Sequence, residues 1–547
     1  MKNNPVLFIF LAFLMTLRVS AQDRSFGTLP LVRKPGGALT KGSGVVDSTK
    51  YKDALKIYNT LVAARGDYRF PVPAFVMRKE TSQVAGMNYD ALEIKLEEKA
   101  YDVCKGFGPD PDGAIAFLLG HELTHYYEKH AWRRGFAADY KDLPIGIKLD
   151  SLQDDAANET EADYLGGFLA YSAGYGLFDK GPQVIKGLYD AYKLPDKIAG
   201  YPSLQDREEL TRRSAQKLKR LVDVFDMANL LTAIGSYQEA YQYYRYVLME
   251  YQSREIYNNL GVTAVLDALQ YFKEGELKYR YPIELDLESS AGKGSGMVDT
   301  RNQLLHQALL HFEAAISMDP NYAPAYLNKA CVYAIMGDAK RAAFYAEEEA
   351  RPAAVRGHYD KTVLDVDVLT GILDAEAGNT AKATQTFKTA AAMNSNLAAI
   401  NLDILNNTPP ETEPVSFAGL PKTEKIDDQS LTGIADNVRI NQKLSITLNK
   451  DLFFHQNPDQ GPGSRLFVSQ NGQTGVNTLF QITSSGYKGN TARNIGPGAT
   501  GNDIITAYQK PQRTIETPLG QIMVYSKMIF ILGKGGKLER WVNYLKL

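Results

Sequence analysis

The sequence has few cysteines, little net charge and no long apolar run after its N-terminus, and each shortage excludes a class of protein. Only Cys104 and Cys331 occur in 547 residues, without the CxxC spacing of a zinc or redox site. A protein of this size needs no disulfides, so we expect two buried free thiols. The net charge of -2 creates no global field that would attract nucleic acid, so no nucleic-acid partner is predicted.

The N-terminus has the pattern of a signal peptide. Lys2 precedes an apolar run at 6–17, and small residues at 19–21 form a cleavage site. We therefore interpret residues 1–21 as a signal peptide and expect an exported protein, periplasmic or secreted. No later stretch offers the roughly 18 apolar residues of a membrane span, so no integral membrane segment is expected after cleavage. An uncleaved N-terminal anchor is the alternative.

Histidine is also scarce, with seven in the chain, yet two lie in one short motif. Residues 121–125 read HELTH, the H-E-x-x-H pattern of zinc hydrolases. On a helix His121 and His125 share a face and can bind one metal ion, and Glu122 can reach a water in an open coordination position. The alternative is a surface helix with two solvated histidines.

The sequence around this motif predicts how its helix is placed. The apolar stretch at 114–119 predicts that the helix is buried at its start. Asp110 or Asp112 can cap it, and Gly120 allows a neighbouring backbone to approach closely, for packing or for function.

A catalytic zinc site needs a third protein ligand, and the best candidates lie in a helical pattern at 155–171. Glu159 and Asp163 are four residues apart and share a face. One carboxylate can bind the metal while the other accepts the free ring N–H of a ligating histidine. Glu161 lies about 200° around the helix from Glu159, so we expect a solvated charge there. Alternatively, all three acids are ordinary helix-start charges.

The two motifs together resemble the M48 family of zinc metallopeptidases, within the gluzincins. The resemblance covers about residues 70–175 and implies an α+β zincin-like peptidase fold with Zn²⁺ as cofactor. The implied metal ligands are His121, His125 and Glu159. It further implies that Glu122 is the general base and that Asp163 supports a histidine ligand.

His130 matches a histidine that often follows the second ligand by five residues in that family, and we interpret it as structural because it is out of register with the metal face. The chain differs from membrane-bound members in lacking transmembrane helices and in its short loop between His125 and Glu159. No residue that stabilises the oxyanion is identified.

The implied reaction is hydrolysis of a peptide bond by Glu-assisted attack of zinc-bound water on a protein or peptide substrate. Zinc polarises the carbonyl, and Glu122 takes a proton from the water and passes it to the leaving amine. Residues 92–97 alternate between apolar and charged and are a candidate edge strand that would hold substrate extended.

Changes in composition and in predicted secondary structure along the chain divide it into three domains, 22–202, 203–407 and 408–547. The zinc motifs lie in the first. The second is an all-α array that resembles tetratricopeptide repeats, with turns at 235–236, 337–338 and 378–379 and a helix junction at 319–326. An insertion at 273–302 interrupts it and is expected to be a loop. Such an array suggests a protein partner.

The last domain, 408–547, is predicted to be a small, mainly β module after a proline-rich linker at 409–414. Strands are expected at 466–468, 478–482 and 522–525, with a hairpin at 528–544. Its sequence shows no recognisable set of catalytic residues, so we expect a binding or docking role.

Two functions fit these observations. The first is an exported zinc-dependent endopeptidase whose repeats recruit a protein substrate or partner, in envelope protein quality control. The alternative is an envelope scaffold or chaperone with a structural or rarely active zinc site. Both functions require the same three metal ligands, so the ligands do not distinguish them. Glu122 favours the enzyme, because a structural zinc site needs no general base.

Overall fold

The computed structural model describes residues 29–30 and 46–547 apart from 80, 82, 109, 131–154, 176–179, 197–202, 274, 284–297, 409–422, 436–444, 458–462, 473–474, 485, 518–519 and 534. The predicted signal peptide at 1–21 and the linker at 409–414 lie outside the described residues.

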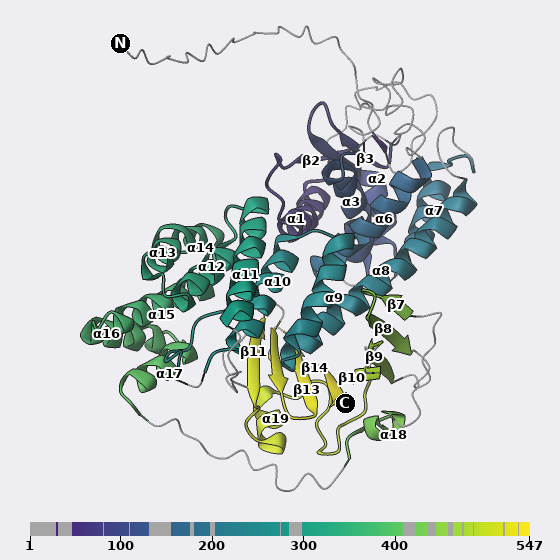
Figure 1. Ribbon diagram of the computed structural model, residues 1–547. Helices are drawn as coiled ribbons and strands as arrows, with labels where there is room; N and C mark the ends of the chain where they lie inside the picture. The colour runs from purple at the N-terminus through teal and green to yellow at the C-terminus, as the bar shows by residue number, and fades with distance from the viewer. Residues whose placement is uncertain are drawn as a thin grey trace, which may run out of the picture. The chain divides into compact units, whose positions relative to one another are not determined.

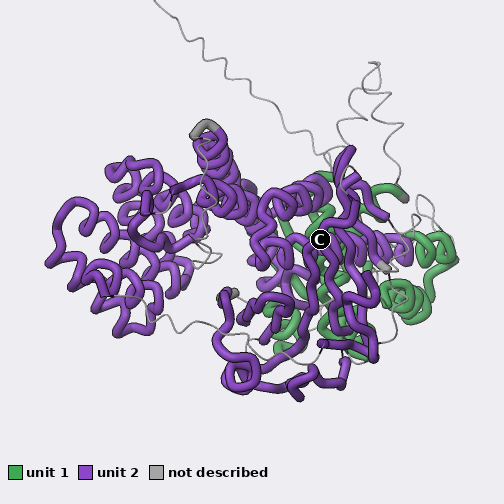
Figure 2. The backbone as a smooth tube through the Cα atoms, turned by 60° about the horizontal axis from the view of Figure 1, so that its bottom comes forward, with its two compact units in different colours: residues 1–56, 73–166, 180–210 green, residues 57–72, 167–179, 211–547 purple. Residues whose placement is uncertain are grey.

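The chain forms two compact units (Figure 2). Unit 1 contains residues 1–56, 73–166 and 180–210, and unit 2 contains 57–72, 167–179 and 211–547. Three helices contribute residues to both units: α1 (Ser48–Arg65), α6 (Asp155–Ser172) and α8 (Leu204–Ala233). The predicted domain boundary at 202/203 therefore falls directly before a helix that belongs partly to each unit.

Unit 1 is built around a four-stranded sheet with the order β1-β3-β4-β2. Its strands are β1 (Leu29–Pro30), β2 (Ala74–Arg78), β3 (Ala85–Asn88) and β4 (Glu93–Glu97). Strand β4 pairs parallel with β2 and antiparallel with β3. The prediction that this segment is an edge strand was wrong, because both of its edges are already paired. Alternation of side chains reports which face is buried and not how many neighbours a strand has.

Three further helices of unit 1 are α2 (Glu98–Lys105), α3 (Pro111–Tyr127) and α7 (Gly181–Tyr192). Helix α3 carries the H-E-x-x-H motif, and the Asp110 carboxylate caps it by accepting the backbone N–H of Gly113 at 2.9 Å. The cap and the buried apolar start that the sequence predicts are therefore both confirmed.

Helices α3 and α6 touch backbone to backbone. A Cβ atom added at Gly120 would lie 2.6 Å from the carbonyl oxygen of Gly166, and one at Gly166 would lie 2.6 Å from the carbonyl carbon of Gly120. Real Cβ atoms do not approach other atoms so closely, so only glycine fits at either position.

In unit 2 a helical array follows α8, as the sequence predicts (Figure 1). Its members are α9 (Tyr237–Glu250), α10 (Arg254–Leu269), α11 (Val298–Met318), α12 (Ala323–Ile335), α13 (Ala339–Phe344), the π-helical turn η1 (Tyr345–Ala350), α14 (Arg351–Gly357), α15 (Asp360–Glu376), α16 (Thr380–Ala392) and α17 (Asn396–Leu405). The turns at Gly235, Gly337 and Gly378 have φ between 75° and 82°, the left-handed conformation that favours glycine after a helix.

The insertion between α10 and α11 is partly built into the array. Tyr279, Tyr281 and Ile283 are buried in the helical core. The backbone N–H and carbonyl of Arg280 bond the Asn401 side chain, each at 2.8 Å. Residues 298–302, expected to belong to the loop, instead open α11.

The C-terminal region contains an antiparallel eight-stranded sheet with the order β11-β12-β13-β14-β10-β9-β8-β7. The strands are β7 (Ser445–Thr447), β8 (Leu452–Asn457), β9 (Ser464–Asn471), β10 (Gly475–Thr483), β11 (Arg513–Thr517), β12 (Gly520–Val524), β13 (Met528–Gly533) and β14 (Leu538–Lys546). The predicted strands and the β13–β14 hairpin are confirmed. A helix, α19 (Gly501–Tyr508), packs its buried Ile504 and Tyr508 into the core of this module.

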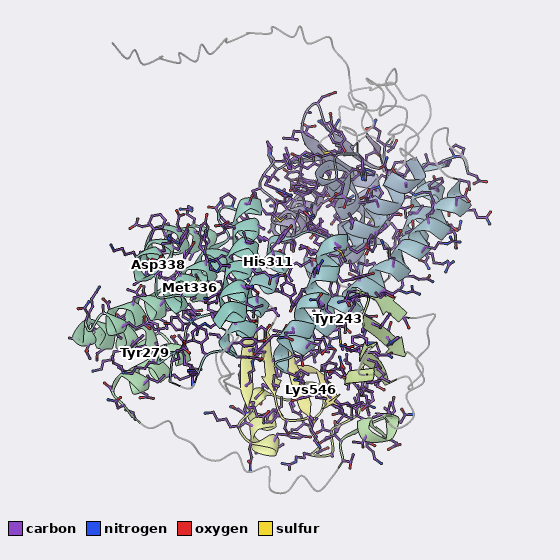
Figure 3. All side chains as sticks on the ribbon, in the orientation of Figure 1. Tyr243, Tyr279, His311, Met336, Asp338 and Lys546 are labelled. Carbon is purple, nitrogen blue, oxygen red and sulfur yellow. The ribbon has the colours of Figure 1, made fainter. Side chains whose placement is uncertain are left out.

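The sheet contacts the first helices of the array within unit 2. Arg513 of β11 donates to the carbonyls of Thr232 and Ala233 at the end of α8, at 3.2 and 3.1 Å. Tyr243 of α9, labelled in Figure 3, packs edge-on against Phe454 with 6.0 Å between ring centroids. The sheet thereby adds a charged donor to two carbonyls at a helix C-terminus, one of which, that of Thr232, also accepts the backbone N–H of Gly235 at 3.1 Å.

Both cysteines are free and buried, as expected. Among the described helices, none combines the length and apolar character needed to cross a bilayer.

Replacing Arg513 by Met should destabilise unit 2, because the substitution leaves two buried carbonyls without their charged donor. We expect a loss of about 2 to 3 kcal/mol in the free energy of unfolding, measured by urea denaturation. Arg341→Met, at an arginine that is 65% exposed, is the matched control and should change little. Equal effects of the two substitutions would contradict the inferred role of Arg513.

Asp223 of α8 makes the stability of unit 2 depend on pH. It is fully buried and accepts a hydrogen bond from Arg465 at 2.8 Å. Burial raises its pKa to about 6, although the charge of Arg465 opposes the rise. A raised pKa in the folded state contributes stability at low pH that is lost as the pH rises through about 6.

The stability of Asp223→Asn relative to the wild type should therefore increase by roughly 2 to 3 kcal/mol between about pH 4 and pH 7.5, as measured by urea unfolding at both values. A difference that does not change with pH would show that Asp223 titrates normally.

Candidate metal centre

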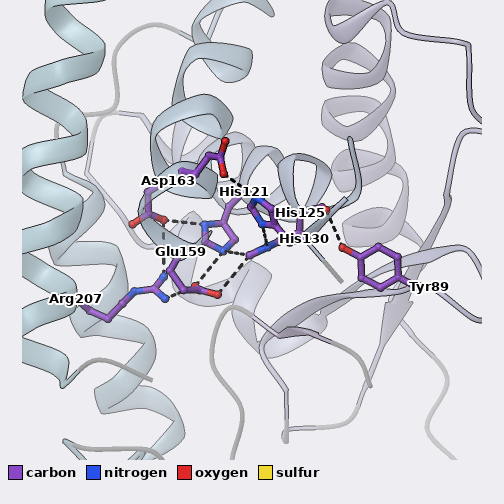
Figure 4. A network of polar contacts seen from close by, with 8 residues as sticks. Tyr89, His121, His125, His130, Glu159, Asp163 and Arg207 are labelled. Carbon is purple, nitrogen blue, oxygen red and sulfur yellow. Dashed lines mark hydrogen bonds and ion pairs between the residues drawn. The ribbon is translucent and has the colours of Figure 1, made fainter. Parts of the chain in front are cut away.

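His121 and His125 lie one turn apart on α3, and both are fully buried. Their Nε2 atoms face each other at 2.9 Å (Figure 4). The predicted pair of ligands therefore converges on one point.

Glu159, on α6, brings its carboxylate to the same point. Its Oε2 lies 3.4 Å from Nε2 of His121, and its Oε1 lies 3.5 Å from Nε2 of His125. One ligand atom from each of the three side chains lies within 4.8 Å of the others. Zinc binds imidazole nitrogen and carboxylate oxygen at about 2.0–2.2 Å, so these separations suit three ligands of one ion.

The other ring nitrogens of both histidines already have partners. Nδ1 of His121 lies 2.7 Å from Oδ1 of Asp163. Nδ1 of His125 lies 2.7 Å from Nδ1 of the fully buried His130. These contacts orient both rings and leave the two Nε2 atoms to face the metal position. The structure thus places Asp163 beside His121 and His130 beside His125.

Glu161 is not simply a solvated charge, contrary to expectation. Its side chain is 38% exposed, and its Oε2 lies 3.1 Å from Nε2 of His130. His130 thus lies between Glu161 and His125. The helical angle predicts correctly that Glu161 points away from the ligands, but it cannot show that a histidine lies on that side.

Arg207, at the start of α8, is the residue of the site that the sequence does not reveal. Its Nη1 donates a short hydrogen bond to Oε2 of Glu159, and its Nη2 lies 3.8 Å from Oδ1 of Asp163. The guanidinium is only 2% exposed. In the sequence it is one of six charged residues between 206 and 213, and nothing local distinguishes it from the others.

The electrostatics of the cluster favour a cation at this point. Burial lowers the pKa of His121, but Asp163 and Glu159 outweigh it and raise the pKa to about 9. Burial also opposes ionisation of Glu159, but the Arg207 charge and the histidines hold its pKa well below the usual range. A carboxylate that remains ionised in a buried site is a suitable metal ligand.

Glu122 lies between the two histidines on α3 and is fully buried. Helix α3 is also held near its second ligand, because the Tyr89 hydroxyl donates to the carbonyl of His125 at 2.7 Å (Figure 4). The structure therefore brings together four of the five predicted site residues, His121, His125, Glu159 and Asp163, and it buries the fifth, Glu122, on the helix that carries both histidines.

Comparison with known proteins identifies one part of the chain. A family model described as a tetratricopeptide repeat matches residues 311–343, which run from within α11 to α13. No match was found among curated proteins. The match agrees with the helical repeats predicted from the sequence, and repeats of this kind suggest protein partners.

Asp163→Asn should weaken zinc binding by roughly 10- to 100-fold, because Asn cannot supply the charged acceptor that orients His121. The affinity can be measured by competition with a chromophoric chelator. Asp190→Asn, at an exposed aspartate of α7, is the control and should bind zinc as the wild type does. Unchanged affinity in Asp163→Asn would mean that the aspartate does not support a ligand.

Proposed function

We propose that the chain is an exported zinc-dependent endopeptidase that hydrolyses peptide bonds in protein substrates. The observation that supports this best is the convergence of two imidazole Nε2 atoms and one carboxylate, with Glu122 on the same helix. Two histidines and a glutamate form a common ligand set of catalytic zinc sites.

In this proposal each residue of the cluster has one role. His121, His125 and Glu159 would hold the zinc, which when bound polarises the scissile carbonyl and acidifies water. Glu122 takes the proton from the attacking water and later gives it to the leaving amine. Arg207 keeps Glu159 ionised, and it does so from a buried position where its charge is little screened.

The helical repeats would recruit the substrate or an accessory protein. The tetratricopeptide match supports binding of a protein partner in general. Export rests on the signal-peptide pattern at 1–21, and a place in envelope protein quality control rests on the resemblance of the two motifs to M48 peptidases.

One observation favours a second function, an envelope scaffold or chaperone with a structural zinc site. His121, Glu122 and His125 are fully buried and Glu159 is 3% exposed. Structural zinc sites are closed, whereas catalytic sites keep one coordination position open to water or substrate. The two functions differ in whether Glu122 matters for activity.

Glu122→Gln separates the two functions. It keeps the size of the side chain and leaves all three ligands, so zinc content should match that of the wild type. Casein cleavage should fall by about 100- to 10,000-fold, because the general base is lost. Zinc would be measured by atomic absorption and cleavage by release of labelled fragments.

Glu348→Gln, at an exposed glutamate in the repeat array, is the matched control and should retain both zinc and activity. Zinc bound by the wild type without cleavage of casein or of a peptide library would favour the scaffold. Undiminished cleavage by Glu122→Gln would exclude Glu122 as the base.

A further inference from the structure

Unit 2 contains an open groove of about 620 Å³ between the array and the β module. One wall is formed by α9 and the end of α10, and the other by the turn that connects β7 to β8 together with Asn471 of β9 and Asn477 of β10. Asn449 joins the two walls by donating to Oε1 of Gln242 at 3.4 Å. The volume lies in the range of ligand-binding pockets.

Side-chain amides dominate the lining of this groove. The six amides are Gln238, Gln242, Gln270, Asn449, Asn471 and Asn477. An amide side chain both donates and accepts, so it can bond the N–H and the carbonyl of a peptide group at once. Such a lining suits an extended polypeptide, whose backbone offers both groups at every residue.

The floor of the groove carries buried negative charge. Asp267 of α10 is 5% exposed; the Gln238 side chain bonds its carboxylate, but its Oδ1 has no hydrogen-bond partner among the described residues. Glu239 of α9, half-buried, accepts a short hydrogen bond from the Ser469 hydroxyl. The cations that line the groove, Arg245 and Lys450, are exposed at its rim. A buried acceptor without a partner is costly, and a bound cation would remove that cost.

We propose that this groove, which we call the amide groove, binds an extended segment of a protein partner and that Asp267 receives a lysine or arginine side chain of that segment. The amides bond the backbone of the segment, and the carboxylate selects the basic residue. This binding does not involve the metal centre, so it goes beyond the proposed peptidase activity and does not depend on it.

The other residues that line the groove argue against other ligands. Its aromatic residue, Tyr237, is 2% exposed and offers no ring face on which a sugar could stack. Its apolar residue, Leu452, is 6% exposed and cannot anchor an apolar side chain. The lining therefore favours a polar polypeptide segment that carries a positive charge.

The test uses the full-length protein and three pools of fluorescein-labelled peptides of five residues. The central residue is fixed as lysine, arginine or the uncharged norleucine, and the other four positions are random. Binding is measured by fluorescence polarisation. We expect the wild type to bind the lysine or arginine pool at least about 10-fold more tightly than the norleucine pool.

Asp267→Asn should reduce this preference to less than about 2-fold, since it removes the charge but keeps the shape. Asp403→Asn, at an exposed aspartate of α17, is the matched control and should keep the wild-type preference. Gln242→Ala should weaken binding of all three pools to a similar degree and so tests the backbone contacts if Asp267→Asn fails to fold.

Equal binding of the three pools by the wild type, or an undiminished preference in Asp267→Asn, would overturn the proposal. The preference for a basic residue is read from Asp267→Asn against Asp403→Asn, and both positions lie outside the metal centre. Loss of casein cleavage in Glu122→Gln therefore leaves this proposal intact, and failure to bind peptides leaves the peptidase proposal intact.

Discussion

The candidate metal centre depends on the contact between Gly120 of α3 and Gly166 of α6. Each glycine lies where a Cβ atom would meet the backbone of the other helix at 2.6 Å. The contact brings the two helices close enough for Glu159 to reach His121, directly after Gly120, and His125, one turn further on. A side chain at either position would separate the helices, and a metal site tolerates only about half an ångström of such displacement.

The close approach of α3 and α6 also buries two negative charges near each other. Glu159 and Asp163 are both buried, and two buried carboxylates repel each other and lose their hydration. Arg207 compensates for both, and Nδ1 of His121 adds a hydrogen bond to Oδ1 of Asp163 at 2.7 Å. Ligands, orienting groups and counter-charge therefore form one network, in which the loss of any member leaves another buried polar group without compensation.

Local features of the site could be predicted from the sequence, whereas long-range ones could not. The shared face of His121 and His125 follows from helical periodicity, and so does the pairing of Glu159 with Asp163. The place of Arg207 in the site could not be predicted, because its partners lie more than forty residues away and its neighbours in the sequence are also charged. The contact between His130 and Glu161 could not be predicted either, because it joins residues 31 positions apart in the sequence.

The same distinction applies to the fold. Strands, turns and the β13–β14 hairpin follow from side-chain alternation and glycine positions. The place of β4 in the interior of its sheet depends on β2 and β3, and the burial of Tyr279 and Ile283 depends on helices from distant parts of the array. The residue pattern of β4 or of residues 279–283 does not show which distant segments will pack against it. Composition alone predicts a loop for such a segment.

Arg513 has a consequence for dissecting the protein into fragments. The arginine belongs to the β module, but the carbonyls that it bonds end α8, the helix from which the repeats begin. A fragment truncated before the module would expose those carbonyls and the face of Tyr243 that Phe454 covers. The repeats and the module are thus best expressed and crystallised together, although composition alone marks them as separable.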